Sequence, residues 1–478
     1  MTQTLQKNQQ TAAGRRRRVV IVGGGFAGIH AAQELGGKPV DVVLVDRRNH
    51  HTFQPLLYQV ALAALSPAQI AQPIRSILRK HSNIEVLMDE VTKIEPENRL
   101  LMLASGAMLE YDDLVLASGA THSYFGHQEW QAHAPGLKTI EDAVEMRRRI
   151  LLAFELAERQ SAEHGWHPPL RFVIIGGGPT GVELAGAISD IARLSLGRDF
   201  RHIRPAEAEV LLIEGASRVL ATFPEDLSQS AVEQLQRLGV KMRLGEHVTD
   251  VQPGFVMVGQ ERMEASVVLW AAGVAASPLG RMLGVELTER GKVPVDDHLN
   301  PQGMRNVFVC GDLAEFRQDG RIVPGVAQPA MQMGRHAARQ ILADLAGKPR
   351  RRFRYFDKGD MATIGRLAAV AKIEWPFRAR WSGFPAWLTW LVVHIYFLIG
   401  FRNRLGILFS WAWTYLTFGE SARLITGDTR LPGWTEAVAL EATSIDRKRH
   451  SKQAMSEPAG VAMPLDEGPR VASGDRAV

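Results

Sequence analysis

The chain has 478 residues, too many for one hydrophobic core, and its length predicts about two to four domains. Its hydrophobic fraction of 46% and its 44 glycines are typical of a globular α/β protein rich in turns and cofactor loops. The net charge of +5 is modest, and no basic stretch alternates with aromatic residues, which argues against nucleic-acid binding. The single cysteine, Cys310, excludes an internal disulfide and a redox-active cysteine pair, and it indicates a reducing compartment. We predict no metal site.

The N-terminal residues 1–17 are polar, and we expect a disordered arm. The run Arg15–Arg18 is either a solvated stretch or a point of attraction to an anionic membrane surface. The apolar stretch VVIV that follows has only four residues, too few for the core of a secretion signal, so we interpret it as a cytoplasmic β-strand.

The first strand runs into VVIVGGGFAG, in which Gly23, Gly25 and Gly28 have the G-x-G-x-x-G spacing. This spacing is typical of a loop that receives a dinucleotide pyrophosphate at a helix N-terminus. A helix and the strand VDVVLVD follow, and this strand ends at Asp46. A carboxylate there can accept the ribose hydroxyls, although an acid at a strand end can also arise by chance.

Residues 50–78 are apolar and punctuated by proline, and we expect a loop and helices over the cofactor. Residues 84–126 alternate with period two, which predicts a small antiparallel sheet and then a parallel strand, LVLASG, ending at Gly119.

The second unit repeats this plan. FVIIGGGPTG places Gly176, Gly178 and Gly181 in the same spacing, and the strand AEVLLIE ends at Glu214 after an insertion. A hairpin and a return strand follow, with Gly273 in the place of Gly119. The duplication predicts two bound dinucleotides, most simply a flavin and a nicotinamide. Glu214 would repel the 2′-phosphate of NADP, which favours NADH.

Four further side chains are candidates for the chemistry. Glu183 lies on the first turn of the second glycine-loop helix, where it is either a dipole partner or a group facing the cavity between nicotinamide and flavin. Asp312 follows a buried strand and could accept a hydroxyl of a flavin's ribityl chain. Gln328 and Gln332, spaced i, i+4, share a helix face and suit a flavin ring or a quinone head; the alternative is that they bind backbone groups.

Residues 381–418 are apolar and rich in tryptophan. The uncharged stretch 384–401 has 18 residues, near the lower limit for a spanning helix, and Pro385 interrupts its start. The stretch 405–418 is too short to span. The composition favours helices lying in the headgroup layer; a buried core and a true span are the alternatives.

These motifs resemble those of the type II NADH dehydrogenases, the single-subunit, non-pumping NADH:quinone oxidoreductases. The resemblance covers about residues 18–430 and is carried by GGGFAG, FQPLLYQVA, LVLASG, GGGPTGVELAG, LWAAG, CGD and AQPAMQ. It implies an α/β fold with two Rossmann-like domains, the NADH domain inserted in the FAD domain, and a membrane-associated helical segment. Where the family usually has a second glutamine after AQPAMQ, this chain has Met333, which puts that contact in doubt.

The resemblance also implies a division of the chain. We expect an arm (1–17), the FAD-binding domain in two parts (18–140 and 296–375), an NADH-binding domain (141–295), amphipathic membrane-anchoring helices (376–430) and a polar, mostly disordered tail (431–478).

The same resemblance implies the site residues. The FAD site would comprise Gly23, Gly25, Phe26, Ala27, Gly28, Asp46, Arg47, Gly119, Asp312 and Gln328. The NADH site would comprise Gly176, Gly178, Pro179, Thr180, Gly181, Glu183, Glu214 and Gly273. Glu183, Gln328 and Gln332 would serve catalysis, the two glutamines on the quinone side of the flavin ring.

The expected activity is FAD-dependent oxidation of NADH with electron transfer to a membrane quinone, menaquinone or ubiquinone. Proton pumping is not expected, because no array of ionisable residues lies in a membrane span. The resemblance implies a homodimer on the cytoplasmic side of the inner membrane, in contact with lipid. Two alternatives remain: a soluble NAD(P)H-dependent reductase of ferredoxin or rubredoxin, and a flavin-bound sensor or interaction protein.

Overall fold

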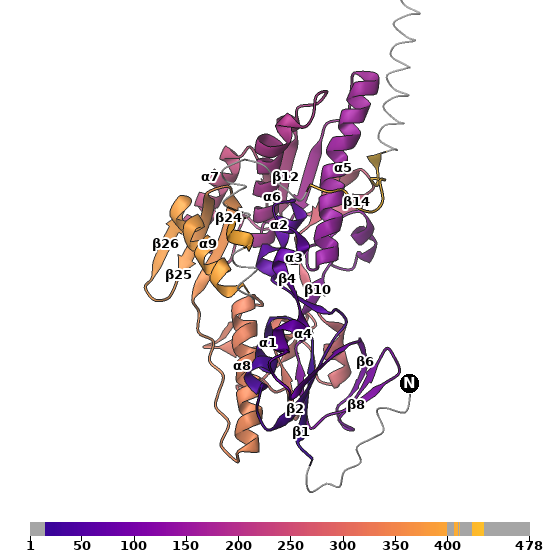
Figure 1. Ribbon diagram of the computed structural model, residues 1–478. Helices are drawn as coiled ribbons and strands as arrows, with labels where there is room; N and C mark the ends of the chain where they lie inside the picture. The colour runs from indigo at the N-terminus through magenta and orange to yellow at the C-terminus, as the bar shows by residue number, and fades with distance from the viewer. Residues whose placement is uncertain (1–14, 399–405, 410, 412–422, 435–478) are drawn as a thin grey trace, which may run out of the picture. The chain divides into compact units, whose positions relative to one another are not determined.

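The computed structural model describes residues 15–398, 406–409, 411 and 423–434 (Figure 1). Most of the predicted N-terminal arm, of the second apolar stretch at 405–418 and of the tail therefore lies outside the described residues. The unit Met1–Gly433 is the one described below.

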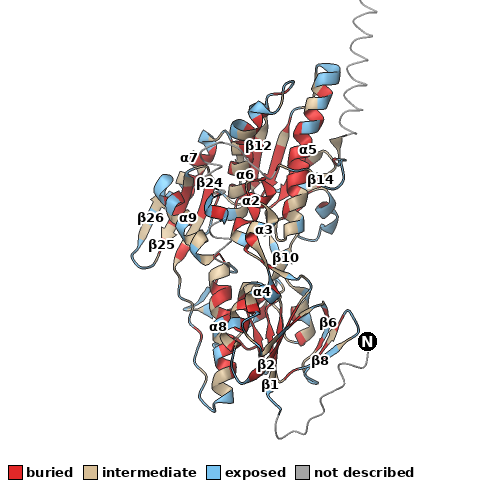
Figure 2. Cartoon of the chain, viewed as in Figure 1, coloured by how far each residue is buried: buried red, intermediate tan, exposed pale blue. Residues whose placement is uncertain are grey.

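A five-stranded parallel sheet forms the first layer, in the order β20–β9–β1–β2–β5. Runs of β-branched residues such as VVIV are buried on both faces, as expected for strands of a covered parallel sheet (Figure 2). β20 comes after the second sheet in the chain, so the polypeptide returns to complete the first. The strands are β1 (Arg17–Val22), β2 (Val40–Asp46), β5 (Ile84–Met88), β9 (Asp113–Leu116) and β20 (Val307–Val309).

Two helices, α1 (Phe26–Leu35) and α8 (Ala327–Leu345), lie side by side on the first sheet (Figure 1). Their backbones approach closely at Gly334, where a Cβ atom would stand 2.8 Å from the carbonyl carbon of Ala27. Any larger residue at Gly334 would separate the helices, so this contact fixes α8 against the first glycine loop.

The second sheet is also parallel, in the order β13–β12–β11–β17. Its strands are β11 (Arg171–Ile175), β12 (Glu209–Glu214), β13 (Lys241–Leu244) and β17 (Val267–Trp270), and its helices are α5 (Ile140–His164), α6 (Pro179–Asp190) and α7 (Glu225–Arg237). Thr139 and Asp142 begin α5 with a reciprocal capping box, and Gly165 ends it in the left-handed conformation. The predicted insertion between α6 and β12 forms short helical turns at Ile191–Ser195, Leu196–Arg198 and Pro205–Glu207.

Each parallel sheet carries a three-stranded antiparallel meander. The first contains β6 (Val91–Glu95), β7 (Leu100–Leu103) and β8 (Met108–Glu110); the second contains β14 (Val248–Gln252), β15 (Phe255–Val258) and β16 (Glu261–Glu264). The predicted sheets are confirmed except at their first runs: IEVLM and KMRL are parallel edge strands of the main sheets. Period-two alternation alone cannot distinguish a half-exposed edge strand from an antiparallel one.

Several short elements complete the chain. The segment after β2, predicted as a loop with helices, contains α2 (Leu57–Ala61), α3 (Pro67–Ile70) and α4 (Ile74–Leu78), which confirms the prediction. Two-stranded ribbons pair β3 (His50–Thr52) with β4 (Ala71–Pro73), β10 (Ala120–His122) with β18 (Val274–Ala276), β19 (Val293–Pro294) with β21 (Ala314–Glu315), and β22 (Arg317–Gln318) with β23 (Arg321–Ile322).

A third antiparallel sheet follows α8 and consists of β24 (Gly359–Gly365), β25 (Ala368–Ile373) and β26 (Ala379–Ser382). Helix α9 (Phe384–Phe397) packs on it through Ala386 and Trp387. β24 lies against α6, and a Cβ atom at Gly186 of α6 would overlap the carbonyl oxygen of Ile364. This close approach brings β24 beside the helix of the second glycine loop.

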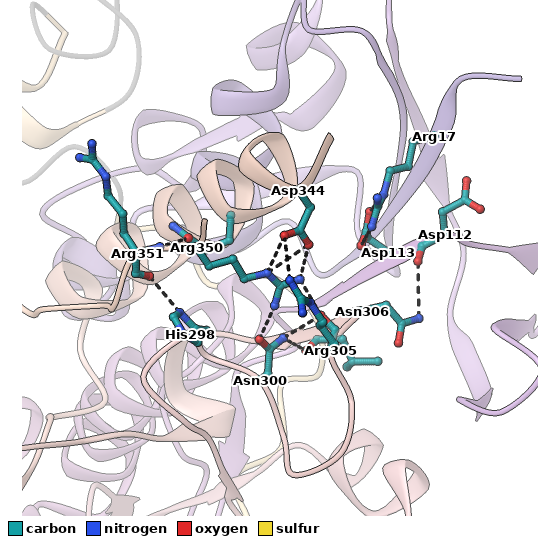
Figure 3. A network of polar contacts seen from close by, with 12 residues as sticks. Arg17, Asp112, Asp113, His298, Asn300, Arg305, Asn306, Asp344, Arg350 and Arg351 are labelled. Atoms are coloured by element: carbon teal, nitrogen blue, oxygen red, sulfur yellow. Dashed lines mark hydrogen bonds and ion pairs between the residues drawn. The ribbon is translucent and has the colours of Figure 1, made fainter. Parts of the chain in front are cut away.

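The N-terminal arginine run is ion-paired, which neither sequence interpretation anticipated. Arg15 contacts Asp112 at 2.9 Å, and Arg17, the first residue of β1, binds the buried Asp113. The described part of the predicted arm is therefore attached to the first sheet. Figure 3 shows Arg17 and Asp113 beside a second polar network, in which Arg350 binds Asp344 at the end of α8.

Candidate functional site

The first glycine loop has the geometry that a pyrophosphate requires. Gly23 has φ +104°, and a Cβ atom there would overlap the carbonyl oxygen of Ala117. A Cβ atom at Gly28 would overlap the carbonyl oxygen of Gly23. Gly25, the residue before α1, has no atom within 4 Å of its Cβ position. The loop is thus closed at its first and third glycines and open at its second, where a phosphate can approach the backbone.

The second loop repeats this geometry. Gly176 has φ +110°, and its Cβ position is 2.6 Å from the carbonyl carbon of Ala271. A Cβ atom at Gly181 would overlap the carbonyl oxygen of Gly176, whereas the space around Gly178 is open. Pro179 occupies the first position of α6, where its missing N–H costs no hydrogen bond. The described chain therefore contains two glycine loops of equivalent geometry.

Asp46 and Glu214 hold the two loops in the same way. The Asp46 carboxylate accepts hydrogen bonds from the amides of Gly24 (2.6 Å) and Arg48 (2.7 Å). The Glu214 carboxylate accepts from the amides of Gly177 and Ala216 (2.7 Å). Both acids thus belong to the loops themselves, which argues against a chance acid at either strand end.

Apart from Gln328, the remaining predicted FAD residues are Asp312, Gly119, Phe26, Arg47 and Ala27. Asp312 lies 3.6 Å from Lys138 Nζ at the end of β20, and Gly119 has φ +69° at the end of β9. The Phe26 ring meets His51 edge-on at 5.0 Å. Arg47 is exposed, and Ala27 is buried, with its backbone carbonyl against Gly334 of α8 and its Cβ atom 3.6 Å from the Cβ position of Gly311.

Gln328 and Gln332 have different surroundings. The Gln332 side chain donates to the carbonyl of Phe356 (3.0 Å) and accepts from its amide (2.9 Å), so it binds backbone, as the alternative interpretation held. Gln328 donates weakly to the carbonyl of Gly359 (3.3 Å), and its Oε1 is buried without a partner. Met333 is buried, with its sulfur 3.4 Å from the amide of Gly311, so this position faces the fold interior. Of the two glutamines, Gln328 is the one with a buried polar atom that lacks a partner, and the buried Ser118 Oγ also lacks one.

Glu183 is the fifth residue of α6, not in its first turn as predicted, because Gly178 rather than a later residue caps the helix. It lines a cavity, open to solvent, between α6, α2 and β24. Burial in this cavity raises the pKa of the Glu183 carboxyl to about 8, opposed by hydrogen bonds with Thr363. Glu183 therefore faces a cavity, and its position between nicotinamide and flavin stays a prediction.

Most of the cavity wall comes from residues that were not predicted as site residues. Thr363 donates to Tyr58 Oη (2.9 Å), Gln59 donates to the same oxygen (3.0 Å), and the Trp411 indole donates to Gln59 Oε1 (2.8 Å). Asp190 faces the cavity seven residues after Glu183, and burial raises its pKa to about 6. The seven-residue spacing of Glu183 and Asp190 places both acids on one helix face, and this could have been seen in the sequence. Nothing in the sequence indicates that β24 contacts this face.

The comparison with known proteins decides the family. The family model described as pyridine nucleotide-disulphide oxidoreductase matches residues 17–334. Over 417 residues the chain is 44% identical to the type II NADH:quinone oxidoreductase Ndh of Mycobacterium tuberculosis, covering 84% of this chain and 89% of that protein. It is 40% identical to NdhA of the same organism over 440 residues, covering 88% and 92%.

The chain belongs to the type II NADH:quinone oxidoreductases. The family predicted from the motifs is thereby confirmed. The solved structure of NDH2 from Plasmodium falciparum in complex with NADH shares the fold of this type II NADH:quinone oxidoreductase, with a TM-score of 0.76 and 19% identity, covering 86% of this chain and 100% of that one. The α/β architecture is confirmed as well.

Proposed function

We propose that the enzyme binds FAD at the first glycine loop and NADH at the second, and reduces a membrane quinone without pumping protons. FAD, when bound, accepts a hydride from NADH and passes two electrons to the quinone. The net reaction converts NADH, a quinone and one proton into NAD⁺ and a quinol. The main support is the pair of equivalent loops, each open only at its second glycine.

Glu214 would select NADH over NADPH. Its carboxylate is held by the amides of Gly177 and Ala216, so it cannot move away from a ribose 2′-phosphate without breaking those bonds. The like charges would repel, whereas the 2′-hydroxyl of NADH can donate to the carboxylate.

Glu183 would act beside the reacting rings. With its pKa near 8 the carboxyl is protonated at neutral pH and can donate as well as accept a hydrogen bond. Its place on the cavity wall next to Thr363 suits a group that orients a substrate or supplies one of the two protons that the quinone takes up. Gln328 would reach the flavin ring with its unpartnered Oε1. Gln332 would support this contact by fixing the backbone of Phe356.

We infer that α9 docks on the membrane surface. No helix of the described residues is long and apolar enough to cross a bilayer. However, α9 exposes Leu388 (45%), Val392 (59%) and Tyr396 (68%), while Trp387 and Trp390 face inward. An exposed apolar face beside a buried one suits peripheral attachment and access to a lipid-soluble quinone. Attachment to the cytoplasmic side of the inner membrane, with contact to its lipids, and a homodimer follow as proposals from the family.

The decisive experiment is NADH oxidation by the purified, membrane-extracted enzyme with ubiquinone and menaquinone analogues, with the flavin absorbance recorded. We expect quinone-dependent turnover and a yellow protein. An equal rate without quinone would contradict the proposal, and a rate restored only by a ferredoxin would favour the soluble reductase. Turnover orders of magnitude below about 1 per second would favour the sensor.

A further inference from the structure

Phe125 is a large apolar side chain that stays mostly exposed beside the second glycine loop, although its ring lies 6.0 Å from that of Trp270. It is 67% exposed, and its backbone is left-handed, with φ +52°. For a residue with a Cβ atom this conformation is strained and persists only where the surroundings impose it. A strained backbone that holds a phenyl ring in solvent is a combination that folding alone does not favour.

The segment around Phe125 is anchored on the second sheet. The Ser123 amide donates to the carbonyl of Gly273 (3.2 Å), and the Trp270 indole donates to the carbonyl of Ser123 (2.8 Å). The neighbouring Tyr124 is buried, and its hydroxyl donates to the carbonyl of Ala134 (2.9 Å). Because the preceding residues are fixed, the backbone that carries Phe125 is held in place, and its ring contacts Trp270.

The ring lies over the end of β17. A Cβ atom at Gly273 would be 2.9 Å from Cζ of Phe125, so this ring, rather than a positive φ, accounts for the glycine. Two residues earlier, Ala271 forms the wall of the glycine loop, since its carbonyl carbon is 2.6 Å from the Cβ position of Gly176. The Phe125 ring therefore borders the loop that would receive the pyrophosphate.

The strand order indicates which half of the dinucleotide would meet the ring. Glu214 ends β12 on one side of β11 and marks the adenosine ribose. β17 lies on the other side of β11, and the dinucleotide crosses this switch point. The nicotinamide half would therefore extend over the end of β17, toward Gly273 and Phe125.

We propose that the Phe125 ring covers the nicotinamide half of bound NADH and positions it; this inference rests on the proposed function. Binding would bury the exposed ring against the dinucleotide and exclude water from that side of the site. The strained backbone is then a fixed feature of the site, present before NADH arrives.

The test is calorimetric titration of the full-length flavin-loaded enzyme with NAD⁺, which binds without reducing it. Phe125→Ala and Phe125→Gly should each raise the dissociation constant about three- to tenfold. Phe125→Tyr, which keeps the ring, should bind as the wild type does. The glycine variant tolerates the left-handed backbone, so its Tm should not fall, which separates binding from folding. Met108→Ala, an equally exposed residue on β8, is the matched control and should have no effect.

Unchanged binding in the alanine and glycine variants, or an equal loss in the tyrosine variant, would overturn the inference. These outcomes differ from failure of the proposed function, in which the wild-type enzyme itself would not bind NAD⁺. The flavin absorbance should remain the same in all variants, since the ring lies at the second loop.

Discussion

Asp46 and Glu214 occupy equivalent positions in the two nucleotide loops. Each carboxylate accepts hydrogen bonds from two amides: that of the central residue of the GGG run (Gly24 or Gly177) and that of the residue two positions after the acid itself (Arg48 or Ala216). The equivalence extends to the open second glycine of each loop. The duplication visible in the sequence is therefore a duplication of the binding geometry, and the two halves differ in what surrounds each loop.

Replacing Glu214 tests the choice of nicotinamide. Glu214→Ser should lower kcat/KM for NADH about tenfold and raise it for NADPH, because a charge-assisted acceptor is lost and the repulsion is removed. Steady-state kinetics with both cofactors measure this ratio. Asp46→Ser, the equivalent change in the first loop, is the control: it should weaken FAD retention and leave the NADH-to-NADPH ratio intact. A ratio that Glu214→Ser does not change would contradict the assignment.

The Glu183 carboxyl predicts a pH effect on stability. Because its pKa of about 8 in the folded protein exceeds the ordinary 4.5, the folded state keeps a proton that the unfolded chain loses. This stabilisation is complete below pH 4.5 and is lost as the pH rises through 8. Glu183→Gln cannot titrate, so its Tm should fall less steeply over that window, as differential scanning calorimetry would measure.

The exposed Glu97→Gln is the control for this effect and should keep the wild-type slope. The same Glu183→Gln variant should lose any inflection near pH 8 in the kcat profile. Identical Tm slopes in wild type and Glu183→Gln would contradict the buried, protonated carboxyl.

The apolar face of α9 predicts a change in membrane partitioning. Leu388→Glu with Val392→Glu should move the enzyme from the membrane to the soluble fraction at unchanged Tm, because both side chains are already exposed. Trp390→Ala should instead cost about 3–5 kcal/mol of stability, since that ring is buried. Met88→Glu with Met108→Glu, at two side chains elsewhere that are at least as exposed, is the control. A double α9 variant that stays on the membrane would exclude this face.

The sequence was most informative where the chemistry is local. The glycines and strand-end acids could be assigned because turn, strand end and helix start lie within a few residues of one another. The surroundings of Gln332 could not, because its i, i+4 spacing gives a helix face but not the Phe356 backbone that this face meets. The same holds for Thr363 beside Glu183: β24 reaches α6 only through tertiary packing at Gly186.

The pairing of Arg15 and Arg17 with Asp112 and Asp113 is a further example. A run of like charges usually indicates a solvated surface, and the acids that pair with it lie at the start of β9, a strand far along the chain. Local composition thus indicated the charge but not its partners.

The most direct measurement compares Gly25→Val with Gly178→Val. Neither Cβ position has an atom within 4 Å, and both backbones have negative φ, so each variant should fold. The Tm of each should equal that of the wild type in the same ligand state, because a bound flavin itself raises the Tm. We predict that Gly25→Val purifies without flavin absorbance, and that Gly178→Val keeps its flavin but no longer binds NAD⁺ in a calorimetric titration. Retention of both ligands by both variants, or the reverse pattern of losses, would contradict the assignment of the two loops.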